Sequence, residues 1–326
     1  MKEKFLRTTL PLAFIVGALM VTTAWAGPFT FKKGDIVAGV GNGQYKVFDP
    51  MGNFLITLDT TSGALEDTGG AFDSSGNLYV TNFSQQSVSK FDINGNLKNA
   101  TFGSGYNADP ESITFDKSGN LYVGQADGSH MVLEFSPAGG PPINQWSPMT
   151  EDRGTDWIDM TSDGHTLYYT SEGRNIMRFD TAGTGTQLSN FATGLPGSNA
   201  YALRELPNGD VLVADTSAAL LLDTHGNVIR TYTDPNLTFS FALNILPDGL
   251  SFVTANLDST GEIFQFNIAT GALEQTIFPS PNVDVAGLIV FGEQGVVNTT
   301  PEPGTLVMFG SGLVGLAGVL RRKINL

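Results

Sequence analysis

Short apolar runs alternate with polar turns along nearly the whole chain, and one kind of turn returns at a fixed interval. Each copy begins with a large apolar residue, usually Phe, which is followed in most copies by Asp and then by Gly. The first positions of the six copies are Phe48, Phe91, Phe135, Phe179, Leu222 and Phe266. Successive copies are 43 or 44 residues apart. An interval of this length indicates one structural unit repeated six times.

A second turn runs in phase with the first and is clearest in residues 72–80 and 115–123. Both segments contain Asp-x-x-Gly-Asn followed by an alternating run such as Leu121-Tyr122-Val123. Gly and Asn at these positions suit hairpin turns, and the alternating runs suit strands. Weaker copies surround Gly164, Gly209 and Gly249.

Two hairpins in each unit give four strands in each unit. A four-stranded sheet repeated every 40–45 residues is typical of a β-propeller. We therefore predict an all-β, six-bladed β-propeller with four-stranded blades over residues 27–297. A solenoid of the same period would usually contain helices, and the pattern between the two ends of the chain shows none.

The first unit lacks one strand, and the end of the repeat region contains an extra one. Residues 34–38 match the second strand of the other units, and only Phe29-Thr30-Phe31 stands before them. The run 285–291 reads as an innermost strand without a blade of its own. We predict that this C-terminal strand joins the first blade and closes the ring, which removes an exposed sheet edge.

The first 26 residues have the pattern of a cleavable secretory signal. Basic residues precede an apolar stretch from Leu10 to Val21, and Ala24-Trp25-Ala26 supplies a small-x-small cleavage site. We expect signal peptidase to act after Ala26 and the mature chain to begin outside the cytoplasm. The alternative is a retained membrane anchor, which the short apolar core and the cleavage triplet disfavour.

The chain ends with the sixteen-residue apolar run 305–320, which is followed by Arg321, Arg322 and Lys323. As a helix this run would span about 24 Å, which is shorter than the hydrocarbon core of a bilayer, about 30 Å thick. Flanking side chains that reach the interface, or local thinning of the bilayer, accommodate the difference. The three cations belong on the cytoplasmic side. We predict a single transmembrane helix and basic tail over residues 305–326, joined to the propeller by the linker 298–304. The alternative, a buried core helix, is disfavoured by those cations.

The triplet Pro301-Glu302-Pro303, the apolar run and the terminal basic cluster together resemble the PEP-CTERM sorting signal of Gram-negative bacteria. The resemblance implies recognition by an exosortase at the periplasmic side of the inner membrane, followed by delivery to the cell surface or the extracellular space. Proteins with this signal usually occur in bacteria that make exopolysaccharide and a biofilm matrix. The signal covers residues 301–326 and concerns the handling of the protein, not the activity of its body.

The repeats lack the Gly-His and Trp-Asp pairs of WD-repeat blades. They resemble the NHL, streptogramin-lyase and regucalcin/gluconolactonase group of six-bladed propellers over most of residues 32–295. The shared motifs are turn residues, so they indicate fold rather than chemistry. In the regucalcin and lactonase proteins a channel metal is held by Glu, Asn and Asp, and this sequence does not place such a set on the corresponding blades.

Charge and cysteine content exclude several kinds of site. The formal net charge is −15, and each end of the chain carries +2, so the body between them carries −19. Such a body repels nucleic acids and anionic lipids, and we predict no nucleic-acid partner. The chain has no cysteine, which excludes disulfides and thiolate metal sites. Divalent cations, neutral sugars and basic partners stay compatible with this charge.

The turn glycines align the starts of the innermost strands, where propellers commonly bind ligands. Residues eight or ten positions before those glycines supply the ligand-binding candidates of the channel mouth: Glu66, Asp109, Glu111, Asp156, Asn199 and Tyr201, with Trp157 beside them. Glu111, Asp156 and Asn199, with Asp109 as a fourth ligand, would form an oxygen site for Ca²⁺ or another divalent cation. The sequence favours the alternative, in which these acids are solvated loop residues on an acidic face, so no cofactor is certain.

Nucleophilic catalysis has little support in the sequence, which contains neither cysteine nor a Gly-x-Ser-x-Gly elbow. His165 and His225 fall in turns and are expected to be exposed, whereas His130 is a candidate base for a lyase-like site. Our leading hypothesis is a non-enzymatic, exported propeller that binds an unknown protein or polysaccharide at the cell envelope. The alternative is a metal-dependent lactonase, or a streptogramin-lyase-like enzyme, acting in the central channel.

Overall fold

The computed structural model describes residues 28–279 and 282–293. The predicted signal peptide 1–26, linker 298–304 and transmembrane segment 305–326 lie outside the described residues, together with the sorting-motif residues they contain. Within the described ranges, no helix has both the length and the apolar character needed to cross a membrane.

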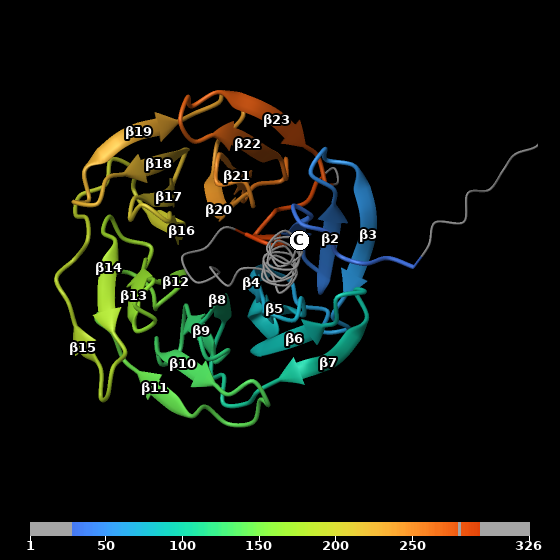
Figure 1. Ribbon diagram of the computed structural model, residues 1–326, viewed down its shortest axis with the longest axis vertical. Helices are drawn as coiled ribbons and strands as arrows, with labels where there is room; N and C mark the ends of the chain where they lie inside the picture. The colour runs from blue at the N-terminus through green and yellow to red at the C-terminus, as the bar shows by residue number, and fades with distance from the viewer. Residues whose placement is uncertain (1–27, 280–281, 294–326) are drawn as a thin grey trace, which may run out of the picture.

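Six four-stranded antiparallel sheets stand around a central axis, which confirms the predicted propeller (Figure 1). From the axis outward, the first three blades are β24 (Gly287–Val290), β1 (Ile36–Gly39), β2 (Gln44–Phe48) and β3 (Phe54–Asp59); β4 (Asp67–Phe72), β5 (Leu78–Asn82), β6 (Ser87–Phe91) and β7 (Leu97–Phe102); and β8 (Pro110–Phe115), β9 (Leu121–Gln125), β10 (Val132–Phe135) and β11 (Asn144–Trp146). The other three are β12 (Ile158–Met160), β13 (Thr166–Tyr169), β14 (Met177–Asp180) and β15 (Thr186–Gln187); β16 (Ala200–Glu205), β17 (Val211–Asp215), β18 (Ala218–Leu222) and β19 (Val228–Tyr232); and β20 (Ser240–Ile245), β21 (Ser251–Asn256), β22 (Ile263–Asn267) and β23 (Leu273–Ile277). The 3₁₀ turn η1 (Phe83–Gln85) is the one helical element of the described residues.

The last strand closes the ring on the first blade, as the sequence predicted. β24 pairs antiparallel with β1, with Val290 opposite Ile36 and Gly287 opposite Gly39. Two further main-chain hydrogen bonds extend the pairing. The N–H of Gly34 donates to the carbonyl oxygen of Phe291 at 2.8 Å, and the N–H of Phe291 donates to the carbonyl oxygen of Asp35 at 2.9 Å. The innermost strands contact their neighbours all the way around the axis, so the two ends of the domain are held in one sheet.

The apolar residue that opens each repeat ends, or nearly ends, the third strand of its blade. These six residues are all buried: Phe48, Phe91, Phe135, Phe179, Leu222 and Phe266. In the sixth blade, Phe266 packs against Phe252 of the same blade and Tyr232 of the fifth, with ring centroids 5.7 and 5.8 Å away. The repeated aromatic residue therefore fills the space between neighbouring sheets, which is why the interval in the sequence matches the blade.

The Asp that follows the aromatic residue fixes the turn between the third and fourth strands. In the second blade, Asp92 Oδ1 accepts hydrogen bonds from the main-chain N–H groups of Asn94 at 2.9 Å and Asn96 at 3.0 Å. Gly95 turns the chain with φ of +73°, a conformation that glycine adopts freely. Slight burial raises the pKa of Asp92, but the bonds from Asn96 and Asn94 outweigh it and hold that pKa below its ordinary value. Such acids have a structural role.

Replacing Asp92 with Ala is therefore expected to destabilise the protein by about 1–2 kcal/mol, because two turn N–H groups lose their acceptor. Asp92→Asn keeps an oxygen in the same place and should lose less than half as much. Urea denaturation of the two variants and the parent measures the difference. Equal midpoints for Asp92→Ala and the parent would show that the turn needs no side-chain acceptor.

The strand directions give the ring two unlike faces. The innermost strands begin at the face that also bears the loops between second and third strands, which we call the mouth face. The Asp-Gly turns lie at the opposite end, the turn face. Each loop between second and third strands contains at least one residue with a left-handed backbone, and one representative per loop, in blade order, is Asn42, Gln86, His130, Glu172, Thr216 and Gly261. Five of these six residues are not glycine, so the mouth face has side chains at positions where glycine would adopt the left-handed backbone with less strain.

Candidate functional site

The innermost strands begin with the residues that the turn glycines aligned. The aligned residues are Thr68 on β4, Glu111 on β8, Tyr201 on β16, Phe241 on β20 and Gly287 on β24, with Asp156 two residues before β12. Because these strands surround the axis, the six residues form a ring at the mouth of the channel.

Three carboxyl groups converge at this mouth, on the third and fourth blades. Glu111, Asp156 and Glu172, which we call the carboxylate trio, each place an oxygen so that the three atoms lie within 4.8 Å of one another. Glu111 is 1% exposed and Asp156 0%, while Glu172 is half-buried in the loop between β13 and β14. The interpretation of these acids as solvated loop residues is wrong for Glu111 and Asp156, because both side chains are buried.

The trio has buried oxygens without hydrogen-bond partners. Among the described residues, nothing donates to Oε2 of Glu111 or to either carboxylate oxygen of Asp156. The main chain of Asp156 is fixed, since the Ser112 hydroxyl donates to its carbonyl oxygen at 2.6 Å and accepts the N–H of Ile158 at 3.0 Å. Native proteins rarely leave buried polar atoms unpaired, and buried carboxylates are normally paired or bound to a metal. These oxygens are therefore a candidate site for a cation.

Glu172 reaches the site from a left-handed backbone conformation with φ of +49°. Nη1 of Arg153 donates to its Oε1 at 3.2 Å, and Nη2 of Arg153 pairs with Asp127. The side-chain amide of Asn199 donates to the main-chain carbonyl of Glu172. The left-handed residue is thus held from two sides, which is how a strained residue persists at a functional position.

Burial and mutual repulsion raise the pKa values of the trio. Burial is the largest cause for each carboxyl, and the charges of Glu111 and Glu172 raise the pKa of Asp156 further, against the opposing charge of Arg153. Burial and the same three carboxylates raise the pKa of the Tyr201 phenol to about 12. Because these pKa values are raised, a divalent cation that binds the trio competes with protons for its oxygens.

The other predicted oxygen ligands, Asp109 and Asn199, lie outside the trio, as does the channel-mouth candidate Glu66, which is exposed. Asp109 is half-buried, and burial and the neighbouring Asp127 raise its pKa. Asn199 uses its amide to hold the Glu172 loop. The structure thus brings together two of the four predicted ligands, Glu111 and Asp156, and adds one that the sequence did not offer.

The predicted aromatic candidates form one wall beside the trio. Trp157 is 1% exposed and Tyr201 6%. The ring centroid of Phe241 lies 5.6 Å from that of Trp157 and 4.9 Å from that of Tyr201. Trp157 Nε1 is buried and has no partner among the described residues. The mouth is therefore acidic on the third and fourth blades and aromatic from the fourth to the sixth.

Sequence reasoning missed Glu172 and Arg153. Both lie in loops, Glu172 between the second and third strands of the fourth blade and Arg153 before β12. The loops between second and third strands differ in length from blade to blade, so the fixed interval that aligned the strand starts does not align them. The repeat spacing therefore carried no signal for either residue.

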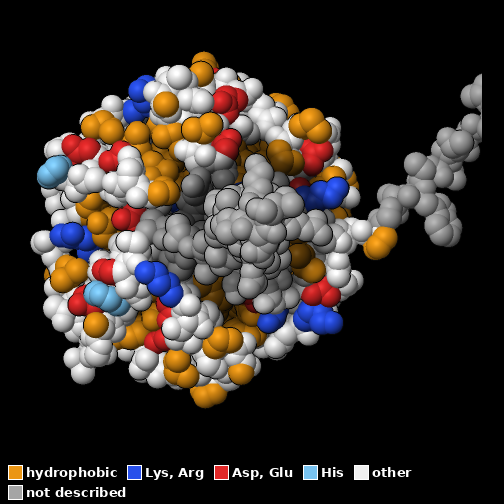
Figure 2. Space-filling view, viewed as in Figure 1, with side chains coloured by type: hydrophobic (Ala, Val, Ile, Leu, Met, Phe, Trp, Pro, Cys, Tyr) orange, Lys and Arg blue, Asp and Glu red, His pale blue; other side chains and the backbone are white. Residues whose placement is uncertain are grey.

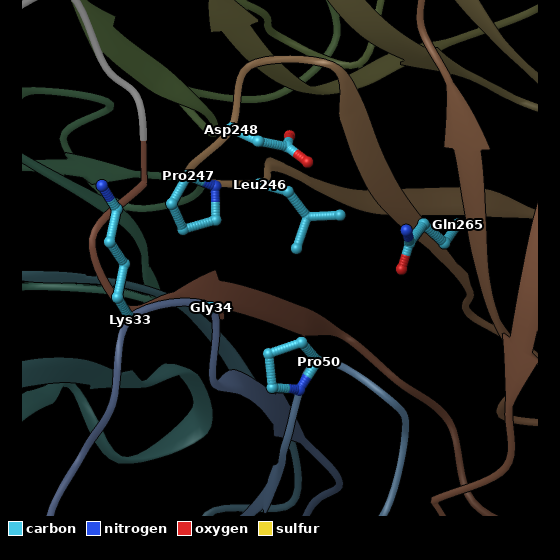
Figure 3. Close-up of a pocket in the computed structure, with 7 residues that line it drawn as sticks. All are labelled: Lys33, Gly34, Pro50, Leu246, Pro247, Asp248 and Gln265. Atoms are coloured by element: carbon cyan, nitrogen blue, oxygen red, sulfur yellow. The ribbon is translucent and has the colours of Figure 1, made fainter.

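A separate groove of about 350 Å³ lies on the turn face, where the sixth blade meets the first (Figure 3). Its lining residues are Lys33, Gly34, Pro50, Leu246, Pro247, Asp248 and Gln265. It contains one acid and no cluster of ligating groups, and it is at the opposite end of the ring from the trio. This groove therefore does not coincide with the carboxylate trio.

Two family models match short parts of the chain. Residues 299–323 match the PEP-CTERM protein-sorting motif, in agreement with the resemblance seen in the sequence. This motif implies processing by an exosortase-type system, export and cell-surface sorting in bacteria. Residues 90–129, which include Glu111, match the N-terminal region of strictosidine synthase-like proteins. No curated protein matches the chain as a whole.

Solved structures share the fold at low sequence identity. A protein of unknown function from Bacteroides caccae aligns over 80% of this chain and 99% of its own, with 14% identity and a TM-score of 0.61. A chain of the nidogen/laminin complex aligns over 79% of this chain and 98% of its own, with 14% identity and a TM-score of 0.60. A streptogramin B lyase covers 65% of this chain at 14% identity and a TM-score of 0.49, a likeness too low to bear on activity. The first two likenesses support the propeller and leave function to the site.

Proposed function

We propose that this protein is an exported, surface-sorted propeller that binds a partner through a divalent cation held at the channel mouth. The observation behind the proposal is the carboxylate trio, whose oxygens converge within 4.8 Å while two of its members are almost fully buried. We further propose that residues 1–26 are removed as a signal peptide and that residues 305–326 hold the protein in the membrane until sorting.

The ligand atoms select the kind of cation. All three groups are carboxylates, and the chain has no cysteine. Oxygen-only sites favour hard cations such as Ca²⁺ and Mg²⁺, whereas zinc and copper favour nitrogen and sulfur. Three carboxylates leave several coordination positions of Ca²⁺ open for water or for oxygens of a partner. The site is therefore suited to binding a partner through a shared calcium ion.

The position of the last described residues supports outward presentation of this site. β24 runs from the mouth face to the turn face, and Glu293 follows it there. Nε of the buried Arg204, on the fifth blade, donates to Oε1 of Glu293 at 2.7 Å. The last described residue, Glu293, thus lies at the turn face, and the sorting segment follows it in the sequence. A propeller tethered by that segment would turn its mouth face away from the tether.

Calcium is expected to stabilise the protein. At a hundredfold excess over the dissociation constant, one site adds about 2.7 kcal/mol, which corresponds to a rise in Tm of roughly 5–10 °C for a domain of this size. Differential scanning calorimetry of residues 27–297 in EDTA, Ca²⁺ and Mg²⁺ measures the shift. Glu111→Gln should abolish it, and Glu66→Gln, the matched control from the exposed rim, should retain it. A shift of the same size in Glu111→Gln would rule out the trio as the cation site.

One feature favours a second candidate, the metal-dependent hydrolase or lyase. The charges of all three carboxylates act on the Tyr201 phenol, and Arg153 pairs with Glu172 beside it. A substrate bound there would have a proton donor in Tyr201 and a cationic group in Arg153 within the same site. This candidate requires turnover of lactone substrates with added Ca²⁺ that is lost in both Glu111→Gln and Tyr201→Phe. The binding function requires the cation-dependent stabilisation alone.

A further inference from the structure

The acidic side chains of the two faces have different roles. Charged side chains of both signs lie around the ring on the face that Figure 2 shows. The role of each acid depends on the loop that contains it. On the turn face, acids such as Asp92 and Asp116 accept hydrogen bonds from the N–H groups of their own turns. Those acids are explained by the fold. On the mouth face, Glu66, Asp152 and Asp284 are exposed residues of the loops that connect blades.

Positive charge is scarce on the mouth face. Its described loops contain no lysine, and their arginines are Arg153 and Arg174. Arg153 is engaged by Asp127 and Glu172, and Nε of Arg174 donates to the carbonyl of Leu195 at 2.7 Å. Two cations on strands also reach loops of this face, since Lys46 Nζ donates to the carbonyl of Pro279 and Arg178 Nε to that of Ser189. All four cationic groups are engaged away from Glu66, Asp152 and Asp284, so the mouth face presents a negative field around the axis.

The centre of this face contains a second, independent sign of a ligand. Oε2 of Glu111 and both carboxylate oxygens of Asp156 are buried at the channel mouth without partners. Acids at the rim lie on separate blades, since Glu66 precedes β4, Asp152 precedes β12 and Asp284 precedes β24. One metal ion bound at the trio cannot reach them all. The rim therefore fits a ligand with several positive charges spread over its length.

We propose that the mouth face binds a lysine- and arginine-rich segment of another protein, which lies across the rim acids beside the cation-filled trio. The proposal rests on the proposed function, since the cation occupies the trio and leaves the rim to the peptide. Polyanions are repelled by the same field. Lysine ammonium groups on flexible stems suit acids whose positions are fixed by different blades. Charge complementarity of this kind chiefly speeds association and makes binding salt-dependent.

Fluorescence anisotropy of a labelled lysine octamer tests the proposal, with residues 27–297 in 1 mM Ca²⁺ at low and physiological salt. The double variant Glu66→Gln/Asp284→Asn is expected to bind about fivefold or more weakly than the parent. The matched control is Asp92→Asn/Asp116→Asn, which removes the same charge from the turn face and keeps the turn acceptors. It should change affinity less than twofold. A glutamate octamer should not bind.

The outcomes separate this proposal from the cation site. Equal weakening by both double variants would mean attraction by net charge alone and would overturn it, as would absence of binding at low salt. Displacement of the peptide by Ca²⁺ would place the peptide in the trio itself, which overturns the proposal and leaves the cation site standing. Retained peptide binding in Glu111→Gln, with the calcium shift lost, is the result expected if the rim and the trio are separate.

Discussion

Replacing Gly287 with Ala is expected to destabilise the protein by about 3 kcal/mol, the largest effect of any single methyl group in the ring. A β-carbon at residue 287 would lie 1.6 Å from the carbonyl oxygen of Thr68 and 2.5 Å from its carbonyl carbon. The obstacle is the main chain of β4, so the first and second blades would have to separate at the strand that closes the ring. Neighbouring blades approach this closely at other mouth positions, since a β-carbon at Gly124 would lie 2.1 Å from the carbonyl oxygen of Thr155.

The matched control is Gly63→Ala, in a loop of the same face. Gly63 has φ of +63° and open space where a β-carbon would stand, so the substitution adds only the cost of a left-handed alanine, roughly 1 kcal/mol. Guanidinium denaturation of both variants gives the comparison. If Gly287→Ala cost no more than Gly63→Ala, close approach of the blades would not be what requires glycine at the closing strand.

Lowering the pH from 8 to about 4 is expected to stabilise the protein. Burial raises the pKa of Asp67 to about 7, against a hydrogen bond from the N–H of Gln44, and one of its oxygens is buried without a partner among the described residues. On the turn face, burial and neighbouring acids raise the pKa of Glu205 to about 7, and burial raises that of Asp159 to about 6.

The sign follows from linkage. Between pH 4 and 7 the unfolded chain releases protons that the folded protein keeps on these groups, so stability falls as the pH rises and is level once both states are ionised. A rise of about three pKa units at Asp67 corresponds to at most about 4 kcal/mol. Acids with lowered pKa values, such as Asp92, act in the opposite direction and only below pH 4. Stability should therefore peak near pH 4.

Asp67→Asn isolates the largest part of this dependence, because Asn keeps an oxygen for the Gln44 N–H and cannot ionise. The variant should gain about 2–4 kcal/mol over the parent at pH 8 and match it near pH 4. Urea denaturation across this range, in EDTA so that no cation binds the trio, provides the measurement. Parallel curves for variant and parent at every pH would show that Asp67 is ionised in the folded protein.

The site was only half predictable. Glu111 and Asp156 occupy equivalent positions of successive repeats, so the turn glycines placed both at the channel mouth. Their burial was not predictable, because acids near turns are usually solvated and the exclusion of water depends on how β8 packs against β12. Asn199 was aligned correctly, yet its amide faces the main chain of Glu172. The direction in which each side chain points at the channel mouth is set by contacts between blades, and the repeat spacing carries no information about those contacts.

The sequence by itself determined the six blades, the four strands in each and the closing strand within residues 285–291, because buried aromatics and Asp-Gly turns are local features that recur with every unit. It also determined the sorting motif, which is read as a linear segment. The tertiary structure decided that Glu172 joins Glu111 and Asp156, that Arg153 lies beside them, and which glycines permit blades to touch. Those outcomes depend on distances between loops of different blades, and such distances exist only after the ring has closed.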